Sequence, residues 1–245
     1  EYGIHIEKSN PDFQKVIKRS RDTATKMSKG IDFLMKKNKI TVIHGTAQLN
    51  GKNTVKVLDA NHKETIYSSN HIIISTGARS RELPNLKQNG KNIIGYREAL
   101  SLKKQPKSMI IVGSGAIGVE FAYFYNTMGT KVTIIEYQEN IVPNEDHDIS
   151  KELSKSLKKK GINILTKASV ESVVEKTGES IVSIKTEDGE KELKAEIILS
   201  AVGITPNIEN IGLEALKITT SEGRIMVDEY YKTNIDGYYA IGDVI

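Results

Sequence analysis

The sequence predicts an α/β protein that contains a Rossmann-like, doubly wound nucleotide-binding domain and an antiparallel β-meander. Three observations carry this prediction. In the second half of the chain, apolar strand patterns alternate with amphipathic helix patterns, which is typical of a parallel sheet. A glycine-rich segment, residues 113–118, lies between the first of these strands and its helix. Short strand patterns separated by polar turn residues then predict the meander.

The first hundred residues contain one long helix pattern and several short strand patterns. Apolar residues recur with a period close to 3.6 over residues 12–37, which predicts a helix. We expect short strands at residues 41–45, 54–58 and 64–68, because polar turn residues separate these segments. Residues 71–76 form a continuous apolar run that predicts a buried strand ending at Gly77.

The second half of the chain alternates strands and helices before it returns to strands. The expected elements, in order, are strand 108–112, helix 116–128, strand 131–136, helix 148–160 and strand 162–166. Three further strands are expected at residues 170–175, 180–187 and 192–199, with a hairpin turn at Asp188 and Gly189.

Composition limits the classes of function. The 245 residues are 38% hydrophobic and 27% charged, and 35 Lys and Arg against 31 Asp and Glu give a net charge of +4, which does not indicate a nucleic-acid-binding protein. The most apolar run, residues 109–125, contains Ser114, Glu120 and three glycines, so we expect no membrane segment and a cytoplasmic protein. The chain has no cysteine, and its five histidines show no metal-ligand spacing, so we expect neither thiol chemistry nor a metal site.

The strongest functional pattern is the glycine-rich segment between strand 108–112 and helix 116–128. In a GxGxxG pattern at this position, Gly113 permits a tight turn, Gly115 lets the backbone approach a pyrophosphate, and Gly118 allows close helix–strand packing. Free amides and the positive end of the helix dipole then favour the anion. The predicted cofactor-binding residues of this loop are Gly113, Ser114, Gly115, Ala116, Ile117 and Gly118.

Two glutamates follow the loop at informative positions. Glu136 ends the next expected strand, where a carboxylate accepts hydrogen bonds from both ribose hydroxyls of an adenosine and repels a 2′-phosphate. The site is therefore expected to prefer NAD over NADP, although a strand-end glutamate facing solvent would give the same pattern. Glu120, in the first turns of the helix, either interacts with the helix dipole or faces the nicotinamide, and the sequence leaves both open.

The two halves of the chain resemble each other around a strand, a small residue and a glycine. The first half reads HIIISTGARSRELPN and the second EIILSAVGITPN, which indicates an internal duplication. Gly77 and Gly203 follow these strands, at the edge where parallel sheets bind ligands, although plain turns would also place glycine there. Asp243, after strand residues 238–241, could bind ligand hydroxyls or simply form a turn.

Five segments together resemble the pyridine-nucleotide disulfide oxidoreductases, and among them most closely the bacterial dihydrolipoamide dehydrogenases. The segments are ISTGARSRELPN, YREAL, VGSGAIGVEFAYFYNTMGTKVTIIE, SAVGITPN and YAIGDV, and the resemblance covers nearly all 245 residues. It implies an NAD-binding domain inserted within an FAD-binding domain of the same type. Partial FAD-binding segments are then expected at residues 1–95 and 226–245, and the NAD-binding domain at 96–225.

The resemblance also implies roles for individual residues. Glu120 matches a glutamate near the nicotinamide–flavin contact, Ala168 a small residue near the adenine, and Gly203 a glycine near the nicotinamide. Asp243 matches the aspartate that binds the ribityl chain of FAD. The remaining positions expected close to FAD are Gly51, Thr76, Gly77 and Ala78.

The departures from the family pattern are equally informative. The family carries a redox-active cysteine pair, its own FAD glycine loop, and a dimerisation domain with a catalytic histidine–glutamate pair, none of which is in this sequence. The chain therefore resembles the middle of a longer homodimeric enzyme. By resemblance, that enzyme oxidises dihydrolipoamide on the lipoyl domains of 2-oxoacid dehydrogenase complexes or of the glycine cleavage system, and passes electrons through a disulfide and FAD to NAD. The chain alone is expected to bind NAD or NADH, to hold only half of an FAD site, and to contain no catalytic residue.

Three alternatives remain open. A reductase of the glutathione or mercuric type would share the layout, but those relatives generally favour NADP, which Glu136 opposes. An NADH oxidase or ferredoxin reductase shares the two-domain plan. A non-catalytic nucleotide-binding module is the third, and the lack of cysteine favours it for the chain as it stands.

Overall fold

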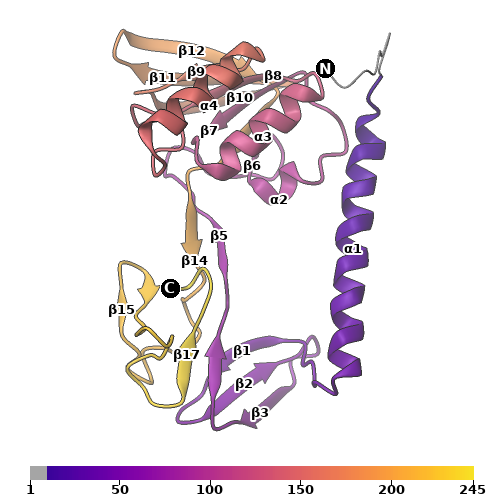
Figure 1. Cartoon of the computed structure of the whole chain (residues 1–245), viewed down its shortest axis with the longest axis vertical. Helices are drawn as coiled ribbons and strands as arrows, with labels where there is room; N and C mark the ends of the chain where they lie inside the picture. Colours follow the sequence, from indigo (N-terminus) through magenta and orange to yellow (C-terminus); the bar gives the residue numbers. More distant parts are fainter. Residues whose placement is uncertain (1–9) are drawn as a thin grey trace. The chain divides into compact units, whose positions relative to one another are not determined.

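The computed structural model describes residues 10–245, which form two compact units (Figure 1). Among the described residues, unit 1 comprises residues 10–30 and 80–203, and unit 2 comprises residues 31–79 and 204–245. Helix α1 (Phe13–Lys37) contributes residues to both units and confirms the predicted long helix.

Unit 1 is built on a five-stranded sheet in the order β6-β13-β7-β8-β9. All four neighbouring pairs are parallel, which confirms the predicted parallel α/β arrangement. The strands are β6 (Ile93–Ile94), β7 (Ser108–Val112), β8 (Lys131–Ile135), β9 (Asn163–Leu165) and β13 (Ile197–Ser200).

Helices cover one face of this sheet (Figure 1). Met109 and Ile111 of β7 point to this face, where they pack with buried residues of α3 (Ala116–Thr127) and α4 (His147–Lys159). The N-terminal turn of α1 also packs here, because the ring of Phe13 lies 6.0 Å from that of Tyr125. Successive side chains of a strand point to opposite faces of the sheet, so the apolar residues of β7 contribute to a separate core on each face.

An antiparallel meander covers the other face. Ile110 and Val112 point to this face and pack with Val182 and Ile184 of the meander. The meander consists of β10 (Ser169–Lys176), β11 (Glu179–Thr186) and β12 (Gly189–Ala195), and the predicted hairpin pairs Thr186 with Gly189.

The single strand predicted at residues 192–199 is wrong, because the structure divides it at Glu196. β12 pairs antiparallel with β11, and β13 enters the parallel sheet beside β7. Glu196 marks the change of partner: its amide donates to Ser108 Oγ (3.1 Å), and its carboxylate accepts from the Lys107 amide (2.8 Å). No Gly, Pro, Asn, Asp or Ser interrupts residues 192–199, so the sequence pattern alone does not show where the partner changes.

The predicted strand at residues 41–45 is also wrong, and the first strand of unit 2 begins at Thr46. Its partner β2 ends at Leu58, which pairs with Thr46. The chain then turns, and Asp59 Oδ1 accepts from the amides of Asn61 (2.8 Å) and Lys63 (2.9 Å). Residues 41–45 therefore have no partner on β2. The antiparallel sheet of unit 2 contains β1 (Thr46–Leu49), β2 (Thr54–Leu58) and β3 (Glu64–Ser68).

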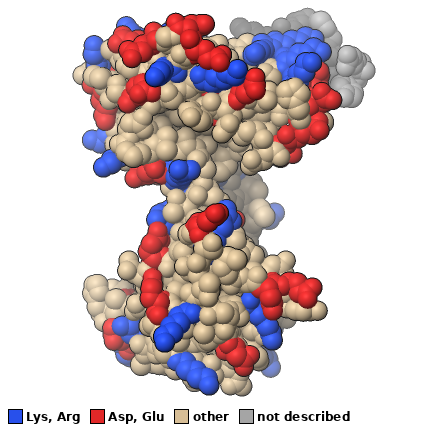
Figure 2. Space-filling view, turned by 90° about the vertical axis from the view of Figure 1, so that its left-hand side faces the viewer, with Lys and Arg blue, Asp and Glu red and all other residues tan. Residues whose placement is uncertain are grey.

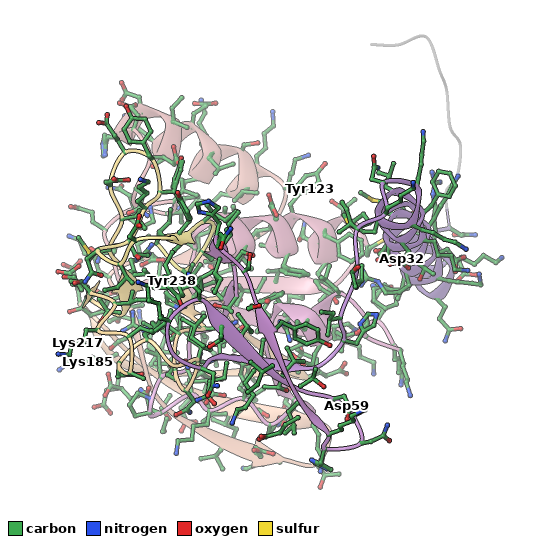
Figure 3. All side chains as sticks on the ribbon, turned by 90° about the horizontal axis from the view of Figure 1, so that it is seen from below. Asp32, Asp59, Tyr123, Lys185, Lys217 and Tyr238 are labelled. Carbon is green, nitrogen blue, oxygen red and sulfur yellow. The ribbon has the colours of Figure 1, made fainter. Side chains whose placement is uncertain are left out.

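Parallel pairing joins two distant segments in unit 2. β4 (Ile72–Ile74) pairs in parallel with β17 (Tyr238–Ala240). Tyr238, labelled in Figure 3, fixes this pair to the β1–β2 turn, because its hydroxyl donates to Gly51 O (2.9 Å) and accepts from the Asn53 amide (2.8 Å).

The remaining elements are α2 (Tyr96–Ala99), β5 (Ala78–Ser80), β14 (Ile204–Pro206), β15 (Thr220–Ser221) and β16 (Arg224–Ile225).

An ion pair in unit 2 connects the residue after Ala78 with the loop after β14. Arg79 binds Glu209 through both carboxylate oxygens, at 2.7 and 3.0 Å, and also donates to Asn207 Oδ1 (2.9 Å). These hydrogen bonds from the Arg79 guanidinium lower the pKa of Glu209 to about 2. Such bidentate pairs are geometrically specific, but about half of each side chain is exposed, so solvent screens the attraction.

The lowered pKa predicts a pH dependence of stability. Glu209 stabilises the folded state above its unfolded pKa of 4.5, and this contribution is lost as the pH falls towards about 2. We expect Glu209→Gln to lower the melting temperature at pH 6 and to have a smaller effect at pH 3. Thermal unfolding followed by circular dichroism measures both. Glu152→Gln, in the exposed Glu152–Lys155 pair, is the control, and an equal effect of Glu209→Gln at both pH values would contradict the prediction.

The buried tyrosine of α3 predicts a second effect on stability. Tyr125 is fully buried and its hydroxyl donates to the Ala99 carbonyl (2.5 Å), while burial raises its pKa and keeps it protonated. Tyr125→Phe leaves that carbonyl without its donor, which costs about 1 kcal/mol. The melting temperature should therefore fall by roughly 2–4 °C. Tyr123→Phe, at an exposed position of the same helix (labelled in Figure 3), should have no such effect, and equal melting temperatures for the two variants would refute this assignment.

Candidate functional site

The carboxyl ends of the parallel strands in unit 1 lie in one row. Register pairs Ser200 with Val112, Val112 with Ile135, and Ile135 with Leu165. β8 lies on one side of β7, and the chain returns to the other side of β7 as β13, so the direction of strand order reverses at β7. Ligands of open α/β sheets bind at such a reversal, beyond the carboxyl ends of the strands. The glycine-rich loop starts immediately after β7.

Two glycines of this loop are required by close backbone packing. Gly113 has φ +98°, and a Cβ there would collide with the carbonyl of Ala201, which follows β13. A Cβ on Gly118 would collide with the carbonyl of Gly113, so α3 can approach the loop only because both residues lack side chains. The structure therefore shows both the tight turn expected at Gly113 and the close helix packing expected at Gly118.

The middle glycine of the loop is different, because its environment is open. Gly115 is the N-cap of α3, and apart from Gly115 and its two chain neighbours no residue has an atom within 4 Å of the position that a Cβ would occupy. No side chain caps this helix end, and its first turn carries no acidic residue. The amides of Ala116, Ile117 and Gly118 are therefore free of side-chain acceptors at the positive end of the helix dipole, which suits a phosphate group.

A buried carboxylate lies next to this loop. Glu136 is 7% exposed, and its Oε2 accepts hydrogen bonds from the amide (2.9 Å) and the hydroxyl (2.6 Å) of the fully buried Ser114. Its Oε1 accepts from the amide of Gln138 (2.7 Å). The loop after β7 and the end of β8 are thus joined through one carboxylate. Glycine spacing does not predict the hydroxyl contact from Ser114, which comes from the register of β7 and β8.

The chain after β9 completes this side of the site. Ala168 is buried, and its amide donates to the Glu136 carbonyl (2.9 Å), so the expected small residue does lie beside the predicted ribose ligand. Lys167 is a neighbouring cation that the sequence analysis did not identify. Its ammonium forms ion pairs with Glu139 (3.3 Å) and Glu187 (3.2 Å), and hydrogen bonds to Glu187 and then Glu139 raise its pKa. These partners are remote in sequence, so only the fold could reveal them.

Gly203 and Glu120 come from different elements of unit 1: Gly203 follows β13, and Glu120 belongs to α3. Gly203 has φ +109° with open space at its Cβ position, and its carbonyl accepts from the Arg81 amide (3.0 Å). Glu120 is exposed on α3 and lines a cavity of about 240 Å³. The other lining residues, mostly apolar, are Val16, Ile17, Ser20, Ala99, Leu100, Phe121 and Phe124.

Unit 2 brings a second group of predicted residues to one sheet edge. Thr76 follows β4 and Asp243 follows the neighbouring parallel strand β17, and the Ile241 amide donates to Ile74 O (3.0 Å) beyond the strand pair. Gly77 has φ +68° with open space around its Cβ position, and Asp243 is exposed. Ala78 begins β5 directly after Gly77. The carboxyl ends of β4 and β17 thus present these residues at the same edge.

Other predicted features of unit 2 have structural partners. The Thr76 hydroxyl donates to the Asn207 carbonyl (2.6 Å), and the Asn207 amide donates to the Gly77 carbonyl (2.9 Å). Gly51 lies in the β1–β2 turn with φ +95°, where its carbonyl accepts from Tyr238 at the amino end of β17. Gly51 is therefore fixed at the opposite end of β17 from Asp243.

Two further features considered in the sequence are a metal site and a membrane-spanning helix. His5 lies outside the described residues, and within residues 10–245 no group of three or more His, Cys, Asp or Glu side chains could hold a metal ion. No helix in that range is both long and apolar enough to cross a bilayer. Figure 2 shows acidic and basic side chains interspersed on the face that it displays.

Comparison with known proteins supports the sequence resemblance. The chain is 43% identical over 260 residues to a dihydrolipoyl dehydrogenase of Rhizobium etli, covering 100% of this chain and 54% of that protein. It is 41% identical over 245 residues to a dihydrolipoyl dehydrogenase of Zymomonas mobilis, covering 99% of this chain and 52% of that one. The crystal structure of LpdA from Mycobacterium tuberculosis matches with a TM-score of 0.89 and 26% identity, over 99% of this chain and 53% of LpdA.

The chain thus spans about half the length of the curated relatives that it matches. Residues 4–245 match the family described as pyridine nucleotide-disulphide oxidoreductase. The matched range includes the glycine-rich loop, Glu136 and the parallel sheet that positions them, so the chain belongs to the pyridine nucleotide-disulphide oxidoreductase family.

Proposed function

We propose that this chain is the NAD-binding portion of a flavoprotein dihydrolipoyl dehydrogenase. The observation that carries the proposal is the open, uncapped helix end at Gly115 beside the fixed carboxylate of Glu136. Family membership and 41–43% identity to two dihydrolipoyl dehydrogenases support the assignment to this enzyme rather than to another disulfide reductase.

Each part of the loop region has a separate task in nucleotide binding. The amides of residues 115–118 hold the pyrophosphate, because the helix end supplies unpaired donors and a positive dipole. Glu136 accepts from the adenosine ribose, and Ala168 leaves room for the adenine. The nicotinamide end lies towards Gly203 and Glu120.

Electrostatics favours NAD over NADP at this site. A 2′-phosphate would bring negative charge close to the Glu136 carboxylate, which is held in place by Ser114 and Gln138. The neighbouring cation Lys167 already pairs with Glu139 and Glu187, so it offers little compensation for a phosphate.

We also propose that Thr76, Gly77, Ala78 and Asp243 form the part of an FAD site that this chain contributes, and that Gly51, at the opposite end of β17, contacts a separate part of the same ligand. The open space at Gly77 and the exposed carboxylate of Asp243 fit such a ligand. When bound, FAD supplies the redox chemistry between thiol and pyridine nucleotide. The cofactor domains would be residues 1–95 with 226–245 for FAD and residues 96–225 for NAD.

The whole protein is proposed to act on dihydrolipoamide carried by lipoyl domains of 2-oxoacid dehydrogenase complexes or of the glycine cleavage system. We propose that it does so as a cytoplasmic homodimer. The 245 residues contain no cysteine, so they supply no thiol for exchange with dihydrolipoamide. The contribution of this chain is to bind and orient the nucleotide.

The open position at Gly115 gives a direct test of NADH binding. Its φ of −64° is accessible to any residue, so Gly115→Val should fold normally while its side chain fills the space proposed for the pyrophosphate. We expect the NADH dissociation constant to rise at least about tenfold, a loss of about 1.4 kcal/mol, as measured by NADH fluorescence titration.

Gly30→Val is the matched control, because Gly30 also has open space around its Cβ position but lies in α1. Its NADH affinity should equal that of the unaltered chain. If Gly115→Val binds NADH normally, the pyrophosphate site is elsewhere. If the unaltered chain binds NADPH more tightly than NADH, the glutathione or mercuric reductase alternative replaces the present proposal.

The absence of a thiol also predicts that the isolated chain has no turnover. With NAD and reduced lipoamide, we expect no increase in absorbance at the NADH wavelength beyond that of a protein-free control. The same preparation must bind NADH, which shows that the site is folded. NADH formation that depends on the chain would contradict the proposed division of tasks.

A further inference from the structure

We propose that Ser114 is a positioning residue that holds Glu136 so that its carboxylate meets only one ribose hydroxyl and discriminates against a 2′-phosphate. This inference rests on the proposed binding of NAD. It assigns to the Ser114 side chain a role in specificity beyond that of its backbone in the glycine-rich loop.

The first step is the count of hydrogen bonds at the carboxylate. An ionised carboxylate has two oxygens with about four acceptor sites. Oε2 of Glu136 accepts from both the amide and the hydroxyl of Ser114, at 2.9 and 2.6 Å, and Oε1 accepts from the Gln138 amide at 2.7 Å. Three sites are therefore occupied by the protein itself, and the remaining site is on Oε1. We therefore infer contact with one ribose hydroxyl, where the sequence analysis expects both.

The second step is that Ser114 cannot move aside. Its carbonyl accepts from the Val142 amide (2.9 Å), and the preceding Gly113 amide donates to Ile135 O (2.8 Å). Ser114 is fully buried and Glu136 is 7% exposed, so water does not compete well for their hydrogen bonds. The Ser114 backbone is thus fixed to both neighbouring segments, and its hydroxyl holds Oε2.

The third step concerns specificity. A glutamate at a strand end can rotate away from an incoming phosphate when its oxygens are free, and it then discriminates weakly. Here the Ser114 hydroxyl adds a third hydrogen bond to those from the amides of Ser114 and Gln138, so it opposes rotation and the negative charge stays at the position of the ribose. Short hydrogen bonds to an ionised carboxylate are stronger than neutral ones, and the distance of 2.6 Å is of this kind.

The matched control is another buried serine of unit 1. Ser150 is 2% exposed, and its hydroxyl donates to the carbonyl of Val142 (3.3 Å) rather than to a carboxylate. Ser150→Ala and Ser114→Ala therefore remove the same atom from similarly buried sites. Only Ser114→Ala removes a hydrogen bond from Glu136, and it leaves the two bonds from the amides of Ser114 and Gln138 in place.

The experiment compares dissociation constants for NADH and NADPH in the unaltered chain, Ser114→Ala and Ser150→Ala. We expect Ser114→Ala to lower the NADPH-to-NADH ratio of dissociation constants about tenfold, and Ser150→Ala to leave it unchanged. A merely structural role of Ser114 would weaken both nucleotides together and leave the ratio constant, which would overturn the proposal. Ser114→Cys, which keeps a side chain of similar size with a weak donor, should give an intermediate ratio and serves if Ser114→Ala fails to fold.

The one-hydroxyl assignment has its own measurement. ADP, 2′-deoxy-ADP and 3′-deoxy-ADP are compared as competitors of NADH on the unaltered chain. We expect one deoxy analogue to bind about tenfold more weakly than ADP and the other to bind as ADP does; equal weakening of both would overturn the assignment. Failure of the unaltered chain to bind NADH would instead refute the proposed function itself, so the two failures are distinguishable.

Discussion

The site in unit 1 depends on the close approach of three backbone segments at the end of β7. Gly113 lies against the carbonyl of Ala201, and Gly118 lies against the carbonyl of Gly113, with no space for a Cβ at either glycine. This contact fixes where α3 begins relative to the sheet. It therefore fixes the open position at Gly115 and the direction of the free amides at the helix end. A side chain at either packed glycine would displace the helix and the binding loop together.

The buried carboxylate is the second constraint, and it acts between strands rather than within the loop. Because Val112 and Ile135 are paired in register, the residues that follow them, the loop and Glu136, are neighbours. Ser114 and Gln138 then supply the donors that a buried carboxylate requires. Lys167 contributes little positive charge to this region, because two glutamates neutralise it. Strand register thus sets both the shape and the charge of the proposed nucleotide site, and under the proposal both disfavour a 2′-phosphate.

The fold was predictable wherever a residue pattern was compatible with only one secondary structure and one pairing partner. The continuous apolar run of β7 predicts a buried strand, and in the structure Met109 and Ile111 lie on one face of the sheet and Ile110 and Val112 on the other. Prediction failed where a strand-forming pattern had more than one solution. Residues 41–45 have strand character but no partner beyond Leu58. Residues 192–199 contain no turn residue, yet they serve two sheets.

The sequence by itself determined the parallel α/β core, the glycine-rich loop and its three distinct glycine positions, because these follow from local chemistry and spacing. It also identified Glu136 as the acidic residue at the next strand end. Only the tertiary structure decided how that carboxylate is used: Ser114 lies 22 residues away from it and contacts it through the register of β7 and β8. The pairing of Lys167 with Glu187 likewise depends on the meander. Contacts between distant residues are set by packing, and no local pattern in the chain encodes them.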